Sequence, residues 1–309
     1  MTEDSSDSAM VNEQKSLLTY KTEDGFEVNS LLVTPEFESE EDLYESPIII
    51  NLYGVLGHFL TRGTPVRLPP LLKEKNISTL SVNTRMAFMG QIMGEGIFPD
   101  TIHEMKESVN ILRKEGFRNI FMLGYSLGAN MAVYYASKTG SFGIKGLILE
   151  GCSYSLPYSQ QRRLEKNRSI PSYEAIYLKA REVLGANPEK KKNDQVFIVY
   201  RAWGDSFNPV DGEMFTYRTW WFMRGPHAYH AKTCEIIGDV KIPVLFIHGA
   251  EDDIVDVWEP KELKDIMNEA GNEDVTLRYI AGAKHDCVEN PEESIETIGE
   301  WVSEVMAKT

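Results

Sequence analysis

Residues 119–137, NIFMLGYSLGANMAVYYAS, place one serine between two glycines at the point where an apolar segment ends. Residues 119–125 have the apolar character of a buried β-strand, and the residues after the serine begin an alanine-rich helix. Gly124 and Gly128 stand two positions before and two positions after Ser126. A sharp strand-to-helix turn crowds these positions, so the glycines predict that the serine stands on such a corner.

A serine on this corner is suited to nucleophilic chemistry. Its hydroxyl stands clear of the backbone, so a carbonyl carbon can approach once a base removes the proton. The amide of Leu127, at the start of the helix, is placed to donate to a developing oxyanion. The G-x-S-x-G pattern alone is weak, and its position between strand and helix is what indicates a nucleophile. The simpler alternative is that Ser126 only caps the helix.

Two later segments supply an acid and a histidine. Residues 242–256, IPVLFIHGAEDDIVD, read as a buried strand that ends in a turn with Asp252, Asp253 and Asp256. His285 stands in a loop of small residues after the next apolar segment, within YIAGAKHDCV. If these strands are parallel, the side chains lie beyond their carboxyl ends, where α/β sheets form binding sites.

Strand-like and helix-like segments alternate along most of the chain, which predicts a mostly parallel sheet with helices on both faces. The eight expected strands are SLLTY (16–20), FEVNSLLVTP (26–35), SPIIINLYG (46–54), ISTLSVNTR (77–85), NIFMLGY (119–125), IKGLILEG (144–151), IPVLFIHG (242–249) and VTLRYIAG (275–282). A helix is expected over residues 101–115, with Asp100 as its N-cap and Gly116 at its end.

With a serine, an acid and a histidine in this order, the sequence resembles the α/β-hydrolase superfamily, in its serine esterase and lipase branch. The resemblance covers residues 16–152 and 239–309, which it implies are the α/β-hydrolase core. In similar proteins the acid is the aspartate of H-G-x-x-D-x-x-V. That pattern matches His248 to Val255 here, with Asp252 at the acid position.

The resemblance implies a catalytic triad. Ser126 is the expected nucleophile, His285 the base, and Asp252 the acid that orients the histidine. Asp253 and Asp256 remain competing acids, expected to be solvated turn residues if Asp252 has this role. No metal and no organic cofactor is expected.

An oxyanion hole needs a second amide besides that of Leu127. In the family it comes from the loop after the strand over residues 46–54, which usually carries His-Gly. This chain has Tyr53-Gly54 there. By position we assign the donor to the amide of Val55, with Gly54 next. Because a backbone donor tolerates side-chain changes, the departure from His-Gly does not weaken the catalytic assignment. It does blur the subfamily.

Residues 153–238 show no clean alternation of strands and helices, apart from an expected helix at 172–187. A structureless loop of this length is implausible in a compact domain, so the segment is predicted to be a cap over the carboxyl edge of the sheet. Residues 1–15 are acidic and polar, and we expect them to be a disordered lead-in.

Apolar residues near the expected entrance suggest a pocket for an acyl or aryl group. The candidate substrate-binding residues, besides Gly54, are Met86, Met89, Trp220 and Trp221. The alternative is that they only attach the cap to the core. Arg201, Arg218 and Arg224 could meet a carboxylate or phosphate on a substrate, or pair with surface acids.

Composition excludes several classes of protein. The net charge of −15 and the isoelectric point near 4.9 make a nucleic-acid partner unlikely on electrostatic grounds. No apolar run reaches the roughly 20 residues that span a bilayer, and the N-terminal residues do not resemble a secretory signal. We therefore expect a cytoplasmic protein, and a homodimer is left open.

The three cysteines, Cys152, Cys234 and Cys287, do not suggest a disulfide framework. His227, His230 and Cys234 form H-x-x-H-x-x-x-C, a spacing that a metal can use. Because no fourth ligand is evident nearby, we favour a cap-helix surface at these positions.

These features predict a serine hydrolase that cleaves a small-molecule acyl ester, or a thioester or lactone, through an acyl-enzyme intermediate. The alternatives on the same triad are an amidase or peptidase, a C–C bond hydrolase and an acyltransferase. A non-catalytic binding protein that kept the fold is a further alternative, which the complete set of Ser126, Asp252 and His285 disfavours.

Overall fold

A computed structural model describes residues 14–61, 64–87, 96–189, 195–203 and 206–308. Eight strands form the main sheet in the order β1-β2-β4-β3-β5-β6-β9-β10. Their bounds are β1 (Gln14–Lys21), β2 (Glu27–Thr34), β3 (Pro47–Leu52), β4 (Ser78–Asn83), β5 (Asn119–Tyr125), β6 (Gly146–Glu150), β9 (Val244–Gly249) and β10 (Val275–Ile280). Each matches a strand expected from the sequence, and the predicted α/β-hydrolase architecture is confirmed.

The sheet is parallel from β4 to β10, and β1 and β2 join it antiparallel. Strands β5, β6 and β9 are buried along almost their whole length. This burial explains their continuous apolar sequences, because a central parallel strand is covered on both faces. The parallel register also brings the carboxyl ends of β5, β9 and β10 to the same edge.

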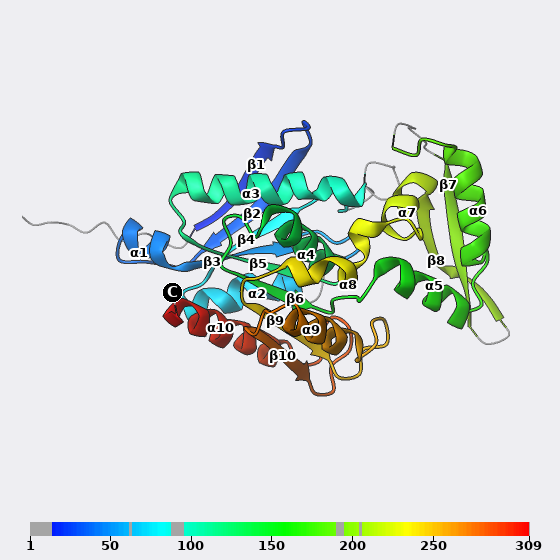
Figure 1. Cartoon of the computed structure of the whole chain (residues 1–309). Coiled ribbons are helices and arrows are strands. Elements are labelled where there is room, and N and C mark those ends of the chain that lie inside the picture. The colour runs from blue at the N-terminus through cyan, green and yellow to red at the C-terminus, as the bar shows by residue number, and fades with distance from the viewer. Residues whose placement is uncertain (1–13, 62–63, 88–95, 190–194, 204–205, 309) are drawn as a thin grey trace, which may run out of the picture.

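Helices cover both faces of this sheet. On one face, α3 (Ile102–Glu115), α4 (Leu127–Thr139) and α9 (Glu259–Glu269) contribute to a large apolar cluster. On the other face, α2 (Thr64–Leu72) and α10 (Pro291–Lys308) form a second cluster with the sheet. In Figure 1, α3 lies above the sheet and α10 below it. The remaining elements before β6 are α1 (Glu40–Glu45) and the short 3₁₀ turns η1 (Lys73–Lys75) and η2 (Phe98–Thr101). Two further 3₁₀ turns, η3 (Tyr229–Ala231) and η4 (Ile237–Asp239), lie between β6 and β9.

The predicted C-terminal end of α3 is correct, whereas its predicted N-cap is not. Gly116 ends the helix with φ of 111° and donates its amide to the last turn, as expected. The prediction of Asp100 as N-cap was wrong, because Asp100 lies inside the 3₁₀ turn η2 and Thr101 precedes the helix. Pro99 starts helical geometry one turn earlier than the sequence suggested.

An insertion between β6 and β9 builds a separate body at one end of the sheet. It contains α5 (Leu156–Lys166), α6 (Tyr173–Leu184), the antiparallel hairpin of β7 (Val196–Trp203) and β8 (Ser206–Thr216), and α7 (Tyr217–Met223). Figure 1 shows these elements grouped beyond the strand ends, connected to the core through α8 (Thr233–Ile236). The expected helix at 172–187 is confirmed as α6, whereas the hairpin was not predicted.

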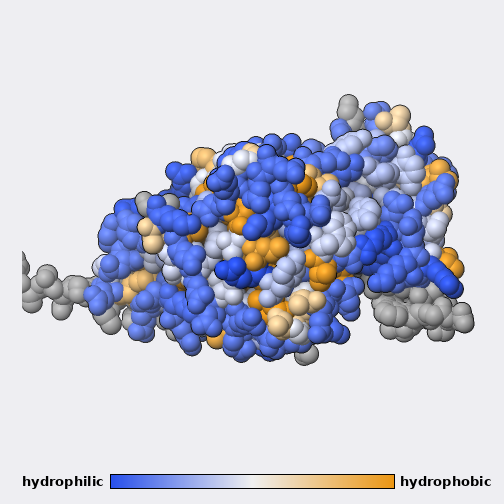
Figure 2. Space-filling model, turned by 60° about the horizontal axis from the view of Figure 1, so that its bottom comes forward, coloured by the Kyte–Doolittle hydropathy of each residue, from blue (hydrophilic) through white to orange (hydrophobic). Residues whose placement is uncertain are grey.

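The surface agrees with the charged composition. Figure 2 shows a mainly hydrophilic face on which hydrophobic residues form small, separate groups. Within the described ranges, no helix combines the length and the apolar character needed to cross a membrane. The three cysteines are all free.

Candidate active site

Ser126 stands on the corner between β5 and α4, with φ of 53° and ψ of −119°. A non-glycine residue in this conformation is strained, which is typical of a residue held in place for function. The flanking glycines allow the turn. A Cβ atom on Gly124 would lie 2.2 Å from the carbonyl oxygen of Gly128, and one on Gly128 would lie 2.5 Å from that of Leu52. Neither position accepts a larger residue, so the geometry is that of a nucleophile elbow.

Three side chains from distant parts of the chain form one hydrogen-bonded series at this corner. The Ser126 hydroxyl lies 2.9 Å from Nε2 of His285. Nδ1 of His285 lies 2.8 Å from Oδ2 of Asp252. The residues follow β5, β10 and β9, whose carboxyl ends meet at one edge. The structure thus brings together the serine, histidine and acid that the sequence analysis selected.

Among the three candidate acids, only Asp252 reaches His285 in the described structure. Its side chain is fully buried, and Oδ1 accepts hydrogen bonds from the amides of Ile254 and Val255 at 2.8 and 2.9 Å. Asp253 lies on an adjoining shallow pocket, and Asp256 forms an ion pair with Arg162.

The site keeps Asp252 ionised. Burial acts to raise the pKa of Asp252, but the hydrogen bond and charge of His285, with the Val255 amide and His248, hold its pKa below the ordinary value. Burial lowers the pKa of His248. Its Nε2 donates to the Val255 carbonyl at 3.1 Å and lies 3.4 Å from Oδ2 of Asp252. His248 therefore stabilises the turn that contains Asp252.

Two backbone amides near this corner have no acceptor in the described part of the chain. Among the described residues, neither the Leu127 amide nor the Val55 amide donates a hydrogen bond. The loop of Val55 passes close to the serine, since a Cβ atom on Gly54 would lie 3.2 Å from the Cβ atom of Ser126. Val55, Gly54 and Leu127 all line the same cavity as Ser126.

That cavity has a volume of about 530 Å³, within the usual range for a small-molecule site. The core supplies its floor and the insertion supplies a wall. The lining residues are Tyr53, Gly54, Val55, Leu56, Gly57, Thr61, Tyr125, Ser126, Leu127, Ile254, Val255 and His285 from the core, and Ser153, Leu156, Ser159, Arg163, Gly212, Glu213, Met214, Phe215 and Arg224 from the insertion.

The structure does not bring Met86, Trp220 or Trp221 to this cavity. Met86 is buried in the main core, and Trp220 is buried on α7 against Tyr173. Trp221 stacks on Tyr177 at a ring distance of 5.8 Å, away from the lining. Met89 lies outside the described residues. Packing contacts account for Met86, Trp220 and Trp221, in line with the attachment alternative.

The sequence analysis missed the wall that β8 and α5 provide. Gly212, Glu213, Met214 and Phe215 line the cavity from β8, and the hairpin itself was not recognised. Arg224 was noted only as one of three arginines that could contact an anion. Of the other two, Arg218 lies over Phe222 with its guanidinium 3.4 Å from the Glu189 carbonyl, and the side chain of Arg201 lies outside the described part.

The residues of the H-x-x-H-x-x-x-C pattern contact different aromatic side chains. His227 contacts Tyr177, and His230 packs on the ring of Tyr134 at 5.1 Å. Across the described ranges, no group of three or more histidine, cysteine and acidic side chains is arranged to hold a metal ion.

A family model described as serine aminopeptidase, S33, matches residues 90–292, about two thirds of the chain. The chain belongs to this family of α/β-hydrolases. The matched region contains the serine corner, the acid turn and the histidine loop of this hydrolase.

More distant similarities agree with the fold. This hydrolase is 27% identical over 142 residues to 2-succinyl-6-hydroxy-2,4-cyclohexadiene-1-carboxylate synthase of Yersinia pestis (strain Pestoides F), covering 44% of this chain and 48% of that protein. The match thus spans about half the length of the curated relatives.

Two solved structures with the same fold are esterases by name. Est1E from Butyrivibrio proteoclasticus aligns over 94% of this chain and 99% of its own, with a TM-score of 0.62 and 19% identity. The Pyrococcus furiosus esterase Pf2001 aligns over 94% and 90%, with a TM-score of 0.63 and 16% identity. At these identities the likeness bears on the fold of this hydrolase.

Proposed function

We propose that the protein is a serine hydrolase that cleaves carboxylic esters through an acyl-enzyme intermediate. The observation that carries the proposal is the hydrogen-bonded series from Ser126 through His285 to Asp252, which opens onto a cavity large enough for a small molecule. A strained serine with an adjacent base is the arrangement that activates a hydroxyl for attack on an acyl carbon.

In the first half of the reaction, Nε2 of His285 takes the Ser126 proton as Oγ attacks the ester carbonyl carbon. The carbonyl oxygen becomes an oxyanion, which the amides of Leu127 and Val55 stabilise. Losing one such donor typically costs about 3 kcal/mol of barrier. His285 then gives the proton to the leaving alcohol, and an acyl-serine remains.

In the second half, water replaces the alcohol. His285 takes a proton from water as its oxygen attacks the acyl carbon, and the Ser126 oxygen leaves with that proton. The carboxylate of Asp252 holds the imidazole orientation and stabilises the imidazolium in both halves. The low pKa of Asp252 supports this role, because the acid must stay ionised while the histidine gains charge.

Residues 153–238 act as a cap in this proposal. The cavity wall formed by α5 and β8 supports the assignment. The end of the segment also packs into the core, because Ala231 and Ile237 are buried with α4 and α9 in the main cluster. The covering part of the cap is therefore centred on α5 to α7.

A second candidate is cleavage of an amide or a C–C bond on the same residues. The family description names an aminopeptidase, and the matched Yersinia protein is named a synthase. Both the ester and the amide reaction pass through an oxyanion at an acyl carbon, so the triad alone does not choose between them.

The test is a kinetic panel on the purified protein. We expect turnover of p-nitrophenyl acyl esters well above that of the matching thioesters and aminoacyl anilides, and loss of all turnover in Ser126→Ala, with unchanged circular dichroism. Faster cleavage of the anilides would favour the aminopeptidase candidate. Ester turnover that persists in Ser126→Ala would contradict both candidates.

A further inference from the structure

The side chain of Arg224 in the cavity has no hydrogen-bond acceptor among the described residues. Arg224, which follows α7, is 7% exposed and lines the same cavity as Ser126. Its backbone carbonyl accepts a hydrogen bond from Tyr173 at 2.8 Å. Within the described residues its Nε is buried without an acceptor, and no ion pair joins its guanidinium to a carboxylate.

The other charges on the cavity wall nearly cancel. Arg163 on α5 forms an ion pair with Glu213 on β8 at 2.7 Å, and Glu213 is the one acid among the described lining residues. Counting Arg163, Glu213 and Arg224 together leaves one net positive charge in this part of the wall.

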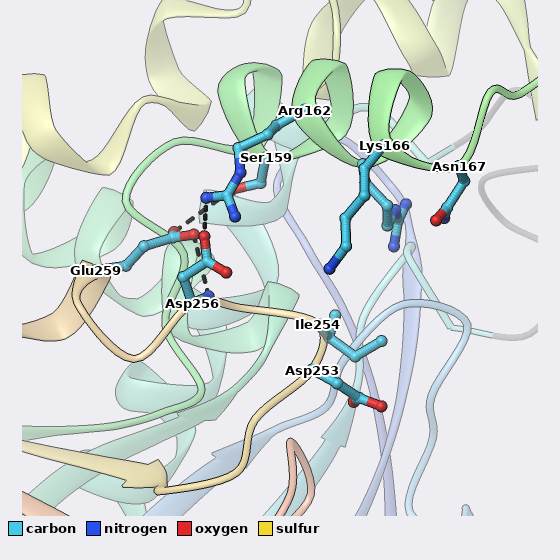
Figure 3. A pocket seen from close by; sticks show the side chains of 9 residues that line it. Ser159, Arg162, Lys166, Asn167, Asp253, Ile254, Asp256 and Glu259 are labelled. Carbon is cyan, nitrogen blue, oxygen red and sulfur yellow. Dashed lines mark hydrogen bonds and ion pairs between the residues drawn. The ribbon is translucent and has the colours of Figure 1, made fainter.

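An adjoining pocket contains an arginine that is paired with a carboxylate, and it serves as a comparison for Arg224. There, Arg162 of α5 meets Asp256, and Glu259 lies beside them, as Figure 3 shows. The acids Asp253, Asp256 and Glu259 line that pocket together with Arg162. In that pocket Arg162 has a carboxylate partner. Within the described residues no carboxylate forms an ion pair with Arg224, on which Glu213 acts only through its charge.

A buried guanidinium without an acceptor destabilises the folded protein, because each unsatisfied donor has lost its hydrogen bonds to water and has formed no other. Burial and the nearby charge of Arg163 lower the pKa of Arg224 to about 10, so the group is still cationic at neutral pH. Such a group is retained in a ligand cavity where a ligand completes its hydrogen bonds.

From this placement we infer that the substrate carries a carboxylate, and that Arg224 binds this carboxylate while Ser126 attacks the ester. The inference rests on the proposed esterase function and adds the substrate class. The substrate is accordingly the monoester of a dicarboxylic acid, or a hydroxy or phenolic acid that is acylated on its hydroxyl group and keeps its carboxylate free.

Charge and shape favour a carboxylate over a phosphate. One uncompensated positive charge balances a monoanion, and a planar guanidinium matches the two oxygens of a carboxylate in a fork. A phosphate dianion would bring one more negative charge into a cavity that already contains Glu213. A cationic substrate would be repelled by Arg163 and Arg224.

The experiment compares pairs of esters that differ only in this charge. The pairs are the p-nitrophenyl monoesters of adipic and suberic acid with their methyl-capped diesters, and para-acetoxybenzoate with its methyl ester. The first pairs carry the carboxylate on the acyl side and the last on the alcohol side. We expect the wild type to prefer the charged member of at least one pair in kcat/KM.

Arg224→Met should remove that preference, with a loss of about 10- to 100-fold on the charged ester and little change on the capped one. Arg181→Met is the matched control, because Arg181 is exposed on α6 and does not line the cavity. A wild type without preference in any pair would overturn the inference, and so would an equal loss on charged and capped esters.

A binding measurement separates this inference from the esterase proposal. In Ser126→Ala, the adipate monoester of a simple alcohol should raise the melting temperature, and the added change Arg224→Met should abolish that shift. Arg224→Met alone should melt at or above the wild-type temperature without ligand, which shows that it folds. A shift that survives Arg224→Met, or a larger shift with a matched phosphonate, would overturn the inference. Turnover of neutral esters would leave the esterase proposal standing.

Discussion

Asp252 is the residue on which the orientation of the candidate base depends. Two backbone amides fix one of its oxygens, and the other accepts the proton of His285 Nδ1. This arrangement leaves the neutral histidine with its free electron pair on Nε2, directed at Ser126. An amide side chain at position 252 can donate to Nδ1 instead, which selects the wrong tautomer.

Asp252→Asn should therefore lower kcat for esters by about three to four orders of magnitude without unfolding the protein. Asp253→Asn is the matched control, since Asp253 is exposed and does not contact His285. Steady-state kinetics on a p-nitrophenyl ester, with circular dichroism for the fold, provides the readout. If Asp253→Asn lowers kcat and Asp252→Asn does not, the acid has been assigned one position too early.

Glu259 is a second buried acid, with the opposite pKa shift. It is 2% exposed, and it accepts hydrogen bonds from the Tyr154 amide at 2.6 Å and from the Ser159 hydroxyl at 3.4 Å. Burial raises the pKa of Glu259 to about 7, against the effect of these hydrogen bonds and of Arg162. The folded state therefore keeps a proton that the unfolded state releases at lower pH.

The contribution of Glu259 to the free energy of unfolding should fall as pH rises from about 4.5 to about 7, because at this position the unfolded state binds fewer protons in that window. Glu259→Gln removes this titration. It should leave stability little changed near pH 4.5 and raise it by about 1–3 kcal/mol at pH 8. Urea denaturation at both pH values measures this, with the exposed Glu262→Gln as control. An effect that is equal at the two values would refute the prediction.

Among the helices, strands and their connections, the β5–α4 corner tolerates added side-chain atoms least. Both glycines touch backbone atoms, and a backbone clash is not relieved by a rotamer change. The corner fixes where Ser126 stands relative to β3, whose Leu52 carbonyl lies against Gly128. The loop with Gly54 and Val55 follows that strand, so the same contact positions the second oxyanion donor.

Gly124→Ala should lower the free energy of unfolding by about 3 kcal/mol or more, since its Cβ atom would lie 2.2 Å from a carbonyl oxygen. Gly140→Ala is the control at the other end of α4. It has open space around it and φ of 61°, so it should cost only about 1 kcal/mol. Equal losses in urea denaturation would show that the corner is not crowded.

The elements were predictable where local sequence and tertiary environment agree. Strand β5 is apolar throughout and central in the sheet, so its sequence pattern and its buried position both favour a β-strand. The β7–β8 hairpin was missed because its aromatic and polar residues lack the alternation of a half-buried strand. Asp100 failed as an N-cap because Pro99 had already started a helical turn.

At the scale of the whole molecule, the cavity exists only because two bodies meet. The sheet edge supplies Ser126 and His285, and the insertion supplies Met214 and Phe215 from β8. The triad positions could be found from sequence, since each follows a recognisable strand. The wall could not, because which face of β8 turns to the serine depends on how the insertion packs against the core.

Met214→Trp should narrow the cavity and shift acyl preference. We expect kcat/KM for an octanoyl ester to fall about 10-fold or more relative to that for an acetyl ester. Met214→Leu, which nearly conserves volume, should leave the ratio almost unchanged. A p-nitrophenyl ester series measures both variants. An unchanged ratio in Met214→Trp would mean that the acyl chain does not reach β8.

The central claim is that residue 126 carries an activated hydroxyl. The most direct measurement is mass spectrometry of the intact protein and of its peptides after reaction with a fluorophosphonate. The account predicts one added phosphonyl group, located on Ser126 and absent from Ser126→Ala. An unmodified wild type, or modification of another residue at the same rate in Ser126→Ala, would contradict it.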